Sequence, residues 1–276
     1  MREAGRGRLR LVERPSENWL GHERRGRGEP LVLIHGVGSS RRVWEPVLGR
    51  LAQKREVIAL DLPGHGSSPM PGNGASFSPG ALARRVALFM DGLGLEKAHL
   101  AGNSLGGWIS LELARLGRAS SVTGLSPAGL WRGSAPLYIG AAFLASYVAT
   151  NALGPFAGYV ASDPVLRSLL VGQFFGRPWR LTSRQTVETL EGFFGSPGVP
   201  RVLEDGQGRF WGGREIDVPV TVAFGAREAI LLPCQSQDRS ELPPHTRWIP
   251  LPGCGHVPTY DDPRLVADVL LAGSSR

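Results

Sequence analysis

Four short runs of apolar residues, none of them alternating in polarity, most constrain the fold of this 276-residue chain. The runs are residues 31–34, 56–60, 98–101 and 218–224. A strand that is apolar at every position is covered on both faces, as the strands of parallel sheets are. Amphipathic stretches that predict helices lie at about residues 43–54, 79–93, 105–117, 234–241 and 262–271. We therefore predict an α/β fold with a doubly wound, mostly parallel sheet.

The regular alternation stops between residues 128 and 215, where no core strand is evident. Asp163-Pro164 has the pattern of an N-cap followed by proline at the first helical position. Thr182 and Gln185 have the spacing of a capping box. We predict that residues 128–215 form a helical cap inserted into an α/β core made of residues 1–127 and 216–276. Residues 8–22 are expected to add an antiparallel hairpin in front of the sheet.

The charge pattern argues against nucleic acid as a partner. The net charge is +7, and eight arginines lie between Arg2 and Arg27. Four glutamates are interleaved with them, whereas a nucleic-acid surface has few acids and some stacking aromatic residues. We interpret this segment as a solvated face and expect no nucleic-acid partner.

The location of the protein is predicted from two segments. The basic first residues are followed by no apolar segment of a secretory signal, which predicts a cytoplasmic protein. The longest uncharged stretch, residues 133–162, is interrupted by Gly, Pro, Ser, Thr and Asn. A membrane span needs about 20 mainly apolar residues, so we expect no membrane partner.

The sequence Gly102-Asn103-Ser104-Leu105-Gly106 stands directly between a predicted strand and a predicted helix. A sharp strand-to-helix turn crowds its neighbours, and glycine two residues either side of the serine removes the side chains that would clash. The hydroxyl of Ser104 is then exposed at the start of the helix, where the helix dipole favours developing negative charge. We interpret Ser104 as a nucleophile; the alternative is a glycine-rich turn that holds a serine by chance.

A second motif, His35-Gly36-Val37, follows the strand at residues 31–34. Together with the serine motif it resembles the α/β-hydrolase family. The resemblance implies that the backbone N–H groups of Val37 and Leu105 form an oxyanion hole, while His35 is structural. Asp61 opens a segment similar to the family's D-x-x-G-x-G-x-S loop, to which we assign no chemistry.

The remaining catalytic residues come from the last quarter of the chain. His256 lies in a Gly-flanked loop before the last predicted helix, in the G-H-x-P setting of the family. The resemblance implies that it is the general base. Glu228 stands where the family usually has aspartate, and we expect it to be the third member of a Ser-His-acid triad. Its extra methylene would carry the carboxylate too far unless the loop retracts.

Taken together, the motifs predict a serine hydrolase that cleaves a carboxylic ester or lactone through an acyl-enzyme. The chain has 21 aromatic residues, and 13 of them lie between Trp131 and Trp211. We expect them to be buried against the catalytic edge of the sheet, which predicts a small-molecule substrate with an apolar part. No cofactor or metal is implied. Two alternatives remain open, a carbon–carbon bond hydrolase of diketone-type substrates and a non-catalytic ligand-binding protein of the same fold.

Overall fold

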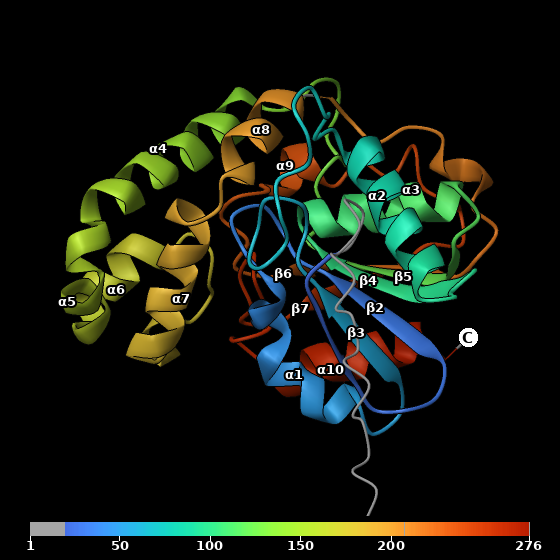
Figure 1. Cartoon of the computed structure of the whole chain (residues 1–276), viewed down its shortest axis with the longest axis horizontal. Helices are drawn as coiled ribbons and strands as arrows, with labels where there is room; N and C mark the ends of the chain where they lie inside the picture. Colours follow the sequence, from blue (N-terminus) through green and yellow to red (C-terminus); the bar gives the residue numbers. More distant parts are fainter. Residues whose placement is uncertain (1–19, 207, 276) are drawn as a thin grey trace, which may run out of the picture.

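A seven-stranded sheet with helices on both faces forms the centre of the molecule (Figure 1). This computed structural model describes residues 20–275 except residue 207. The strands follow the order β1-β3-β2-β4-β5-β6-β7, and only β1 is antiparallel to its neighbour. Their bounds are β1 His22–Arg25, β2 Pro30–Ile34, β3 Glu56–Leu60, β4 Ala98–Asn103, β5 Ala119–Leu125, β6 Val220–Gly225 and β7 Arg247–Leu251.

The four apolar runs are confirmed as β2, β3, β4 and β6. The sequence did not reveal β5, because Ala-Ser-Ser-Val-Thr-Gly-Leu is rich in small polar residues. Ser121 and Thr123 are buried, and Ser121 Oγ lies 2.9 Å from His99 Nδ1. Most of the hairpin predicted at residues 8–22 lies outside the described residues, and the antiparallel edge strand β1 begins at His22.

Successive residues of β2 pack into the core on opposite faces of the sheet. Leu31 and Leu33 pack with helices α1 (Glu45–Leu51) and α10 (Pro263–Gly273), whereas Val32 and Ile34 pack with α2 (Pro79–Gly92) and α3 (Leu105–Arg115). A short 3₁₀ helix, η1 (Arg41–Trp44), leads into α1. The fourth predicted helix, residues 234–241, was overestimated, since α9 spans only Pro233–Ser236. Both faces are therefore covered, as the continuous apolar runs required.

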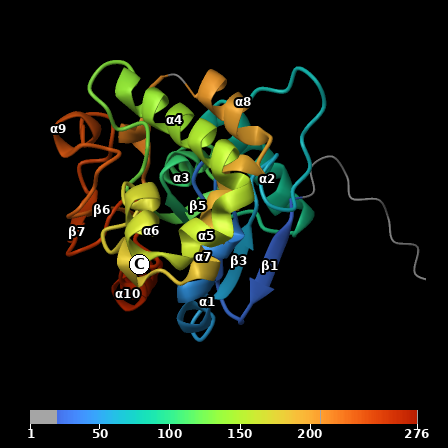
Figure 2. The same cartoon turned by 90° about the vertical axis from the view of Figure 1, so that its left-hand side faces the viewer.

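The described residues between β5 and β6 form helices and loops but no strand (Figure 2). Asp163 Oδ1 accepts hydrogen bonds from the N–H groups of Val165 and Leu166, and Thr182 forms the predicted capping box with Gln185. The helices are α4 Leu137–Leu153, η2 Gly154–Phe156, α5 Ala157–Ser162, α6 Pro164–Val171, η3 Pro178–Arg180, α7 Ser183–Phe194, α8 Gly198–Asp205 and η4 Gly213–Glu215. We refer to this insertion as the cap.

The aromatic residues of the cap are not all buried, and the prediction is wrong for several of them. Phe143, Phe174 and Phe175 are buried, but Phe156 and Tyr159 have 61% and 71% of their surface exposed. The helical stretch Leu137–Ser162 is long and apolar enough to cross a membrane by length and composition, and only 6% of its most apolar window is buried. The cap therefore has an apolar outer surface as well as an apolar inner one.

Candidate active site

Ser104 lies at the turn between β4 and α3 in a strained conformation. Its φ of 54° and ψ of −117° fall where side-chain-bearing residues are rarely found. The turn is held by its carbonyl, which accepts hydrogen bonds from the N–H groups of Gly107, Trp108 and Ala128. A Cβ on Gly102 would lie 2.1 Å from the Gly106 backbone, and a Cβ on Gly106 would lie 2.0 Å from Ile34 O. Both glycines are therefore required for β4, β2 and α3 to meet.

His256 and Glu228 form a buried pair beside the turn. The two carboxylate oxygens of Glu228 lie 3.0 and 3.1 Å from His256 Nδ1. The other ring nitrogen, Nε2, is buried and has no hydrogen-bond partner among the described residues. It lines the same cavity as Ser104. The imidazole thus has one nitrogen fixed by a carboxylate and the other available to a hydroxyl group or a substrate.

The Glu228 loop accommodates the longer acid. Oε1 also accepts hydrogen bonds from the N–H groups of Ile230 and Leu231, at 2.9 and 3.0 Å. Burial raises the pKa of this carboxyl, but the charge and hydrogen bond of His256 and the two N–H groups outweigh burial and leave the pKa below its ordinary value. Glu228 is therefore ionised at neutral pH.

The two residues expected to form the oxyanion hole lie on either side of Ser104. Leu105 is the first residue of α3, so its N–H is among those with no partner inside the helix. Val37 follows Gly36, where an added Cβ would lie 3.1 Å from Ser104 Cβ. His35 Nε2 accepts the N–H of Leu62 at 2.9 Å, which holds this loop close to the serine. His35 is fully buried, and burial lowers its pKa.

Asp61 has structural contacts only. Its carboxylate accepts hydrogen bonds from the N–H groups of Arg41 and Ser67 and pairs with the Arg41 side chain. It ties η1 to the loop after β3. Within the described residues, no three His, Cys, Asp or Glu side chains are grouped so that they could hold a metal ion.

Two residues that the sequence analysis did not single out join the parts of the site. Asn103 Nδ2 donates to Leu125 O and, at 2.8 Å, to His256 O, so the residue before the serine fixes the backbone of the histidine. Asp261 is buried, and its carboxylate accepts the N–H groups of Gly255, Gly176 and Arg177 at 2.7–2.8 Å. Asp261 thereby joins the histidine loop to the cap. The position of Asp261 five residues after His256 was the only signal in the sequence.

We expect Asp261→Asn to destabilise the protein and to lower kcat more than it raises KM. The amide would turn an N–H donor toward backbone donors, and each buried group left unsatisfied costs about 1–3 kcal/mol. Asp262→Asn is the matched control, because Asp262 caps α10 through Leu265 N and asparagine caps equally well. Thermal unfolding and steady-state kinetics measure both effects. Equal behaviour of the two variants would show that Asp261 does not position the histidine loop.

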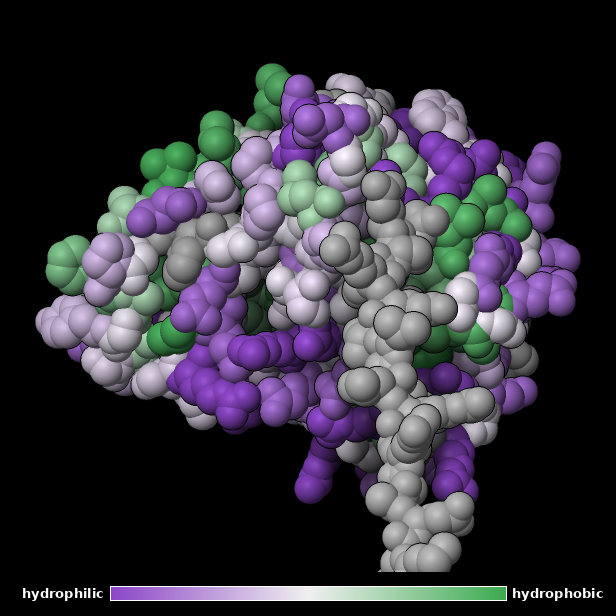
Figure 3. Space-filling view, in the orientation of Figure 1, coloured by the Kyte–Doolittle hydropathy of each residue, from purple (hydrophilic) through white to green (hydrophobic). Residues whose placement is uncertain are grey.

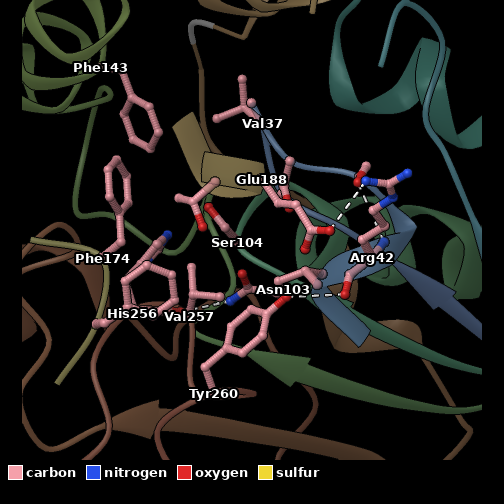
Figure 4. A pocket seen from close by; sticks show the side chains of 17 residues that line it. Val37, Arg42, Asn103, Ser104, Phe143, Phe174, Glu188, His256, Val257 and Tyr260 are labelled. Carbon is pink, nitrogen blue, oxygen red and sulfur yellow. Dashed lines mark hydrogen bonds and ion pairs between the residues drawn. The ribbon is translucent and has the colours of Figure 1, made fainter. Parts of the chain in front are cut away.

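Three adjoining cavities reach Ser104 or its neighbours. The catalytic cavity, of 50 Å³, is lined by Ser104, His256 and Val37 and by the polar residues Arg42, Glu188 and Tyr260 (Figure 4). An apolar cavity of 150 Å³ shares Ser104, Val37 and Phe143 with it and continues between Trp108, Trp131 and Leu231. A third, the cap cavity, has a volume of 290 Å³ and shares Phe174 and Thr189 with the catalytic cavity. Ser104 therefore lines both the catalytic cavity and the apolar cavity.

A mostly parallel sheet, a strained serine after β4 and a His–Glu pair after β6 and β7 define the α/β-hydrolase class of enzymes. The sequence model of the "Alpha/beta hydrolase family" matches residues 31–269. The chain therefore belongs to the alpha/beta hydrolase family.

Individual relatives have different named activities. The chain is 31% identical over 259 residues to the dihydrolipoyllysine-residue acetyltransferase component of an acetoin cleaving system from Pseudomonas putida, covering 89% of this chain and 63% of that protein. It is 29% identical to an epoxide hydrolase of Mycobacterium tuberculosis over 70% of this chain and 93% of that one. An esterase from Thermogutta terrifontis has the same fold, with a TM-score of 0.71, 21% identity and 92% of each chain covered. The chain thus spans less than two thirds of the Pseudomonas relative.

Proposed function

We propose that the protein is a serine hydrolase that cleaves a carboxylic ester or lactone with an apolar part. The proposal rests on the contacts of the two ring nitrogens of His256. Its Nδ1 is bound by the ionised Glu228, and its buried Nε2 has no partner in the described part of the chain, in the cavity that Ser104 also lines. This is the arrangement that a general base requires.

The reaction follows from these positions. Ser104 Oγ attacks the carbonyl carbon while His256 Nε2 takes its proton, and Glu228 stabilises the imidazolium that forms. The carbonyl oxygen becomes an oxyanion, held by the N–H groups of Val37 and Leu105. The C–O bond then breaks, and the alcohol leaves with the proton from Nε2. Water, deprotonated by His256, attacks the acyl-enzyme and releases the acid and Ser104.

The residue at the turn between β4 and α3 helps to distinguish between the possible reactions. The Pseudomonas relative is named for acetyl transfer, which is also chemistry at an acyl carbon. Epoxide hydrolases of this family use aspartate at the turn, so Ser104 argues against that reaction here. A fluorophosphonate probe tests the proposal directly, because it labels only an activated serine. Absence of labelling in folded protein would favour a non-catalytic binding protein, and turnover of diketones but not esters would favour carbon–carbon cleavage.

The apolar cavity is proposed to hold the apolar part of the substrate. Trp108, Trp131 and Leu231 line it, and it shares Ser104 with the catalytic cavity. The proposed enzyme is cytoplasmic and acts on a small molecule. Residues 128–215 are its cap, and residues 1–127 and 216–276 are its core.

We expect kcat/KM to rise with chain length from p-nitrophenyl acetate to hexanoate. Each methylene that leaves water for the apolar cavity contributes up to about 0.8 kcal/mol, or roughly fourfold. Trp131→Ala should flatten the series, because the indole forms part of the lining. Trp211→Ala is the control, since Trp211 is 57% exposed and lines none of the three cavities. A series that stays flat or falls in the native protein would contradict the apolar preference.

A further inference from the structure

The outer surface of the cap exposes large apolar side chains on α4, η2, α5 and α6 (Figure 3). Leu137 is 89% exposed and Leu169 is 78% exposed. We call this surface the cap face, and it consists of Leu137, Leu144, Val148, Phe156, Tyr159, Val165 and Leu169. Isolated exposed apolar residues are ordinary, but a contiguous group marks a surface that is covered by something else.

Helix α4 explains why the cap face is continuous. Leu137, Leu144 and Val148 are separated by seven and four residues, so they lie on one side of the helix. The opposite side carries Ile139 and Phe143, which line the apolar cavity together with Leu137 at the start of the helix. A helix that is apolar all round is normally buried on all sides, whereas α4 is covered by protein on its inner side only.

The cap face lies in a stretch of sequence with very few charged residues. Between residues 133 and 176 the only charged residues are Asp163 and Arg167. Asp163 caps α6, and Arg167 is buried with its guanidinium donating to Ala161 O. The first charged residues beyond this stretch are Arg132 and Arg177, followed by Arg180. Arg180 belongs to η3, which packs against α6, and is exposed. An apolar surface whose sequence is flanked by the exposed Arg132 and Arg180 is complementary to a membrane with anionic headgroups.

The cap cavity opens beside this face and adjoins the catalytic cavity. It lies between α4, α6 and α7, and the exposed Leu169 is part of its wall. Its polar side chains are bonded to the protein: Gln173 Nε2 donates to Ser146 Oγ at 2.7 Å, and Thr189 Oγ1 donates to Gln185 O. The remaining lining is Ala, Leu, Val and Phe. Phe174 separates the cap cavity from the catalytic cavity and packs against Phe143, with ring centroids 6.2 Å apart.

We propose that the cap face docks on the surface of an anionic lipid membrane and that apolar substrate enters from the membrane through the cap cavity, past Phe174. This departs from the sequence-based expectation of no membrane partner, which considered only a membrane span. The entry step rests on the proposed function; the docking does not. A lipid surface fits better than a second copy of the chain, because a second copy seated on the cap face would cover the opening of the cap cavity. Peripheral docking also leaves the inner side of α4 in place over the active site, whereas a membrane span would remove it.

Vesicle flotation of the full-length protein tests the docking. The probes are vesicles of phosphatidylcholine with phosphatidylglycerol and vesicles of phosphatidylcholine alone. Native protein should float with the anionic vesicles, and added salt should reduce the bound fraction. Leu144→Glu with Val148→Glu should lower binding by about tenfold or more, because two apolar contacts are replaced by charges that the headgroups repel. Leu88→Glu with Leu116→Glu is the matched control, since these leucines are 48% and 49% exposed on the core.

The outcomes separate docking from catalysis. Ser104→Ala should float as the native protein does, so loss of its activity leaves the docking measurable. The Leu144/Val148 variant should keep native hydrolysis of soluble p-nitrophenyl acetate and lose activity on a long-chain ester dissolved in the vesicles. Native protein that does not float, or a Leu144/Val148 variant that floats like the control, overturns the proposal. A native dimer in solution that this variant converts to a monomer, without vesicle binding, would assign the cap face to a second copy.

Discussion

Replacement of Ser104 by alanine is expected to lower kcat/KM for p-nitrophenyl esters by about 10⁴-fold or more. The loss is large because no acyl-enzyme can form, and the oxyanion donors and the base then act only on water. The side chain is small and its hydroxyl lines a cavity, so the thermal midpoint should change little. Steady-state kinetics and thermal unfolding of the same preparation measure both quantities.

Ser110→Ala is the matched control for this experiment. Ser110 lies on α3, the helix that follows Ser104. It is fully buried and donates its hydroxyl hydrogen to Gly106 O at 2.8 Å. Its replacement should cost some stability and leave the chemistry intact. The fluorophosphonate probe should label native protein and the Ser110 variant but not the Ser104 variant. Turnover retained in Ser104→Ala, free of contaminating esterase, would end the serine mechanism.

Glu228→Gln is expected to lower kcat by up to about 10⁴-fold, the loss found when a triad carboxylate becomes an amide. The amide keeps the shape but removes the charge that stabilises the imidazolium, and it can present an N–H group to His256 Nδ1. Glu188→Gln is the control, because Glu188 lines the catalytic cavity and pairs with Arg42 and Arg184 rather than with His256. A loss below about tenfold at position 228 would show that another group orients the histidine.

Glu228→Asp tests whether the geometry of this loop suits glutamate or aspartate. The shorter side chain withdraws the carboxylate by about 1.5 Å, one C–C bond. Because Glu228 Oε1 binds both His256 and the N–H groups of Ile230 and Leu231, the aspartate cannot keep all three contacts without movement of the loop. We therefore expect activity to fall. Activity equal to or above that of native protein would mean that the loop retains the family's aspartate geometry.

The lowered pKa of Glu228 sets the sign of a pH effect on stability. The carboxyl is ionised more easily in the folded protein than in the unfolded chain. Its contribution is therefore complete above the unfolded pKa, about 4.3, and disappears as pH falls through the lower folded value. The difference in thermal midpoint between native protein and Glu228→Gln should accordingly shrink below about pH 4.

Sequence alone was sufficient wherever a residue's role depends on its neighbours in the chain. The glycines around Ser104 predicted the turn, because the clash that they avoid arises within a few residues and one adjacent strand. The caps at Asp163 and Thr182 are likewise local. The strand β5 was missed because its burial comes from lying between β4 and β6, and its own small polar residues give no apolar signal.

The contacts that assemble the site could not be predicted in this way. Asp261 accepts backbone groups 85 residues away in sequence, at Gly176, and Asn103 binds a carbonyl 153 residues away, at His256. Neither residue has a pattern that distinguishes it from an ordinary polar loop residue. The exposed aromatic residues of the cap show the same limit, because composition indicates that a side chain needs apolar surroundings but not whether the protein itself supplies them.

The interruption of the sheet between β5 and β6 has a consequence for the order of folding. β5 is an inner strand between β4 and β6, yet its partner β6 begins at Val220, after the whole cap. During synthesis at about 5–20 residues per second, residues 126–219 take roughly 5–20 s to appear. Throughout that interval one side of β5 has no neighbouring strand, and such an edge can pair with other chains in aggregates. Aggregation of incomplete chains should therefore increase with their concentration, and Ser104 meets its proposed partners Glu228 and His256 only after β6 and β7 have been made.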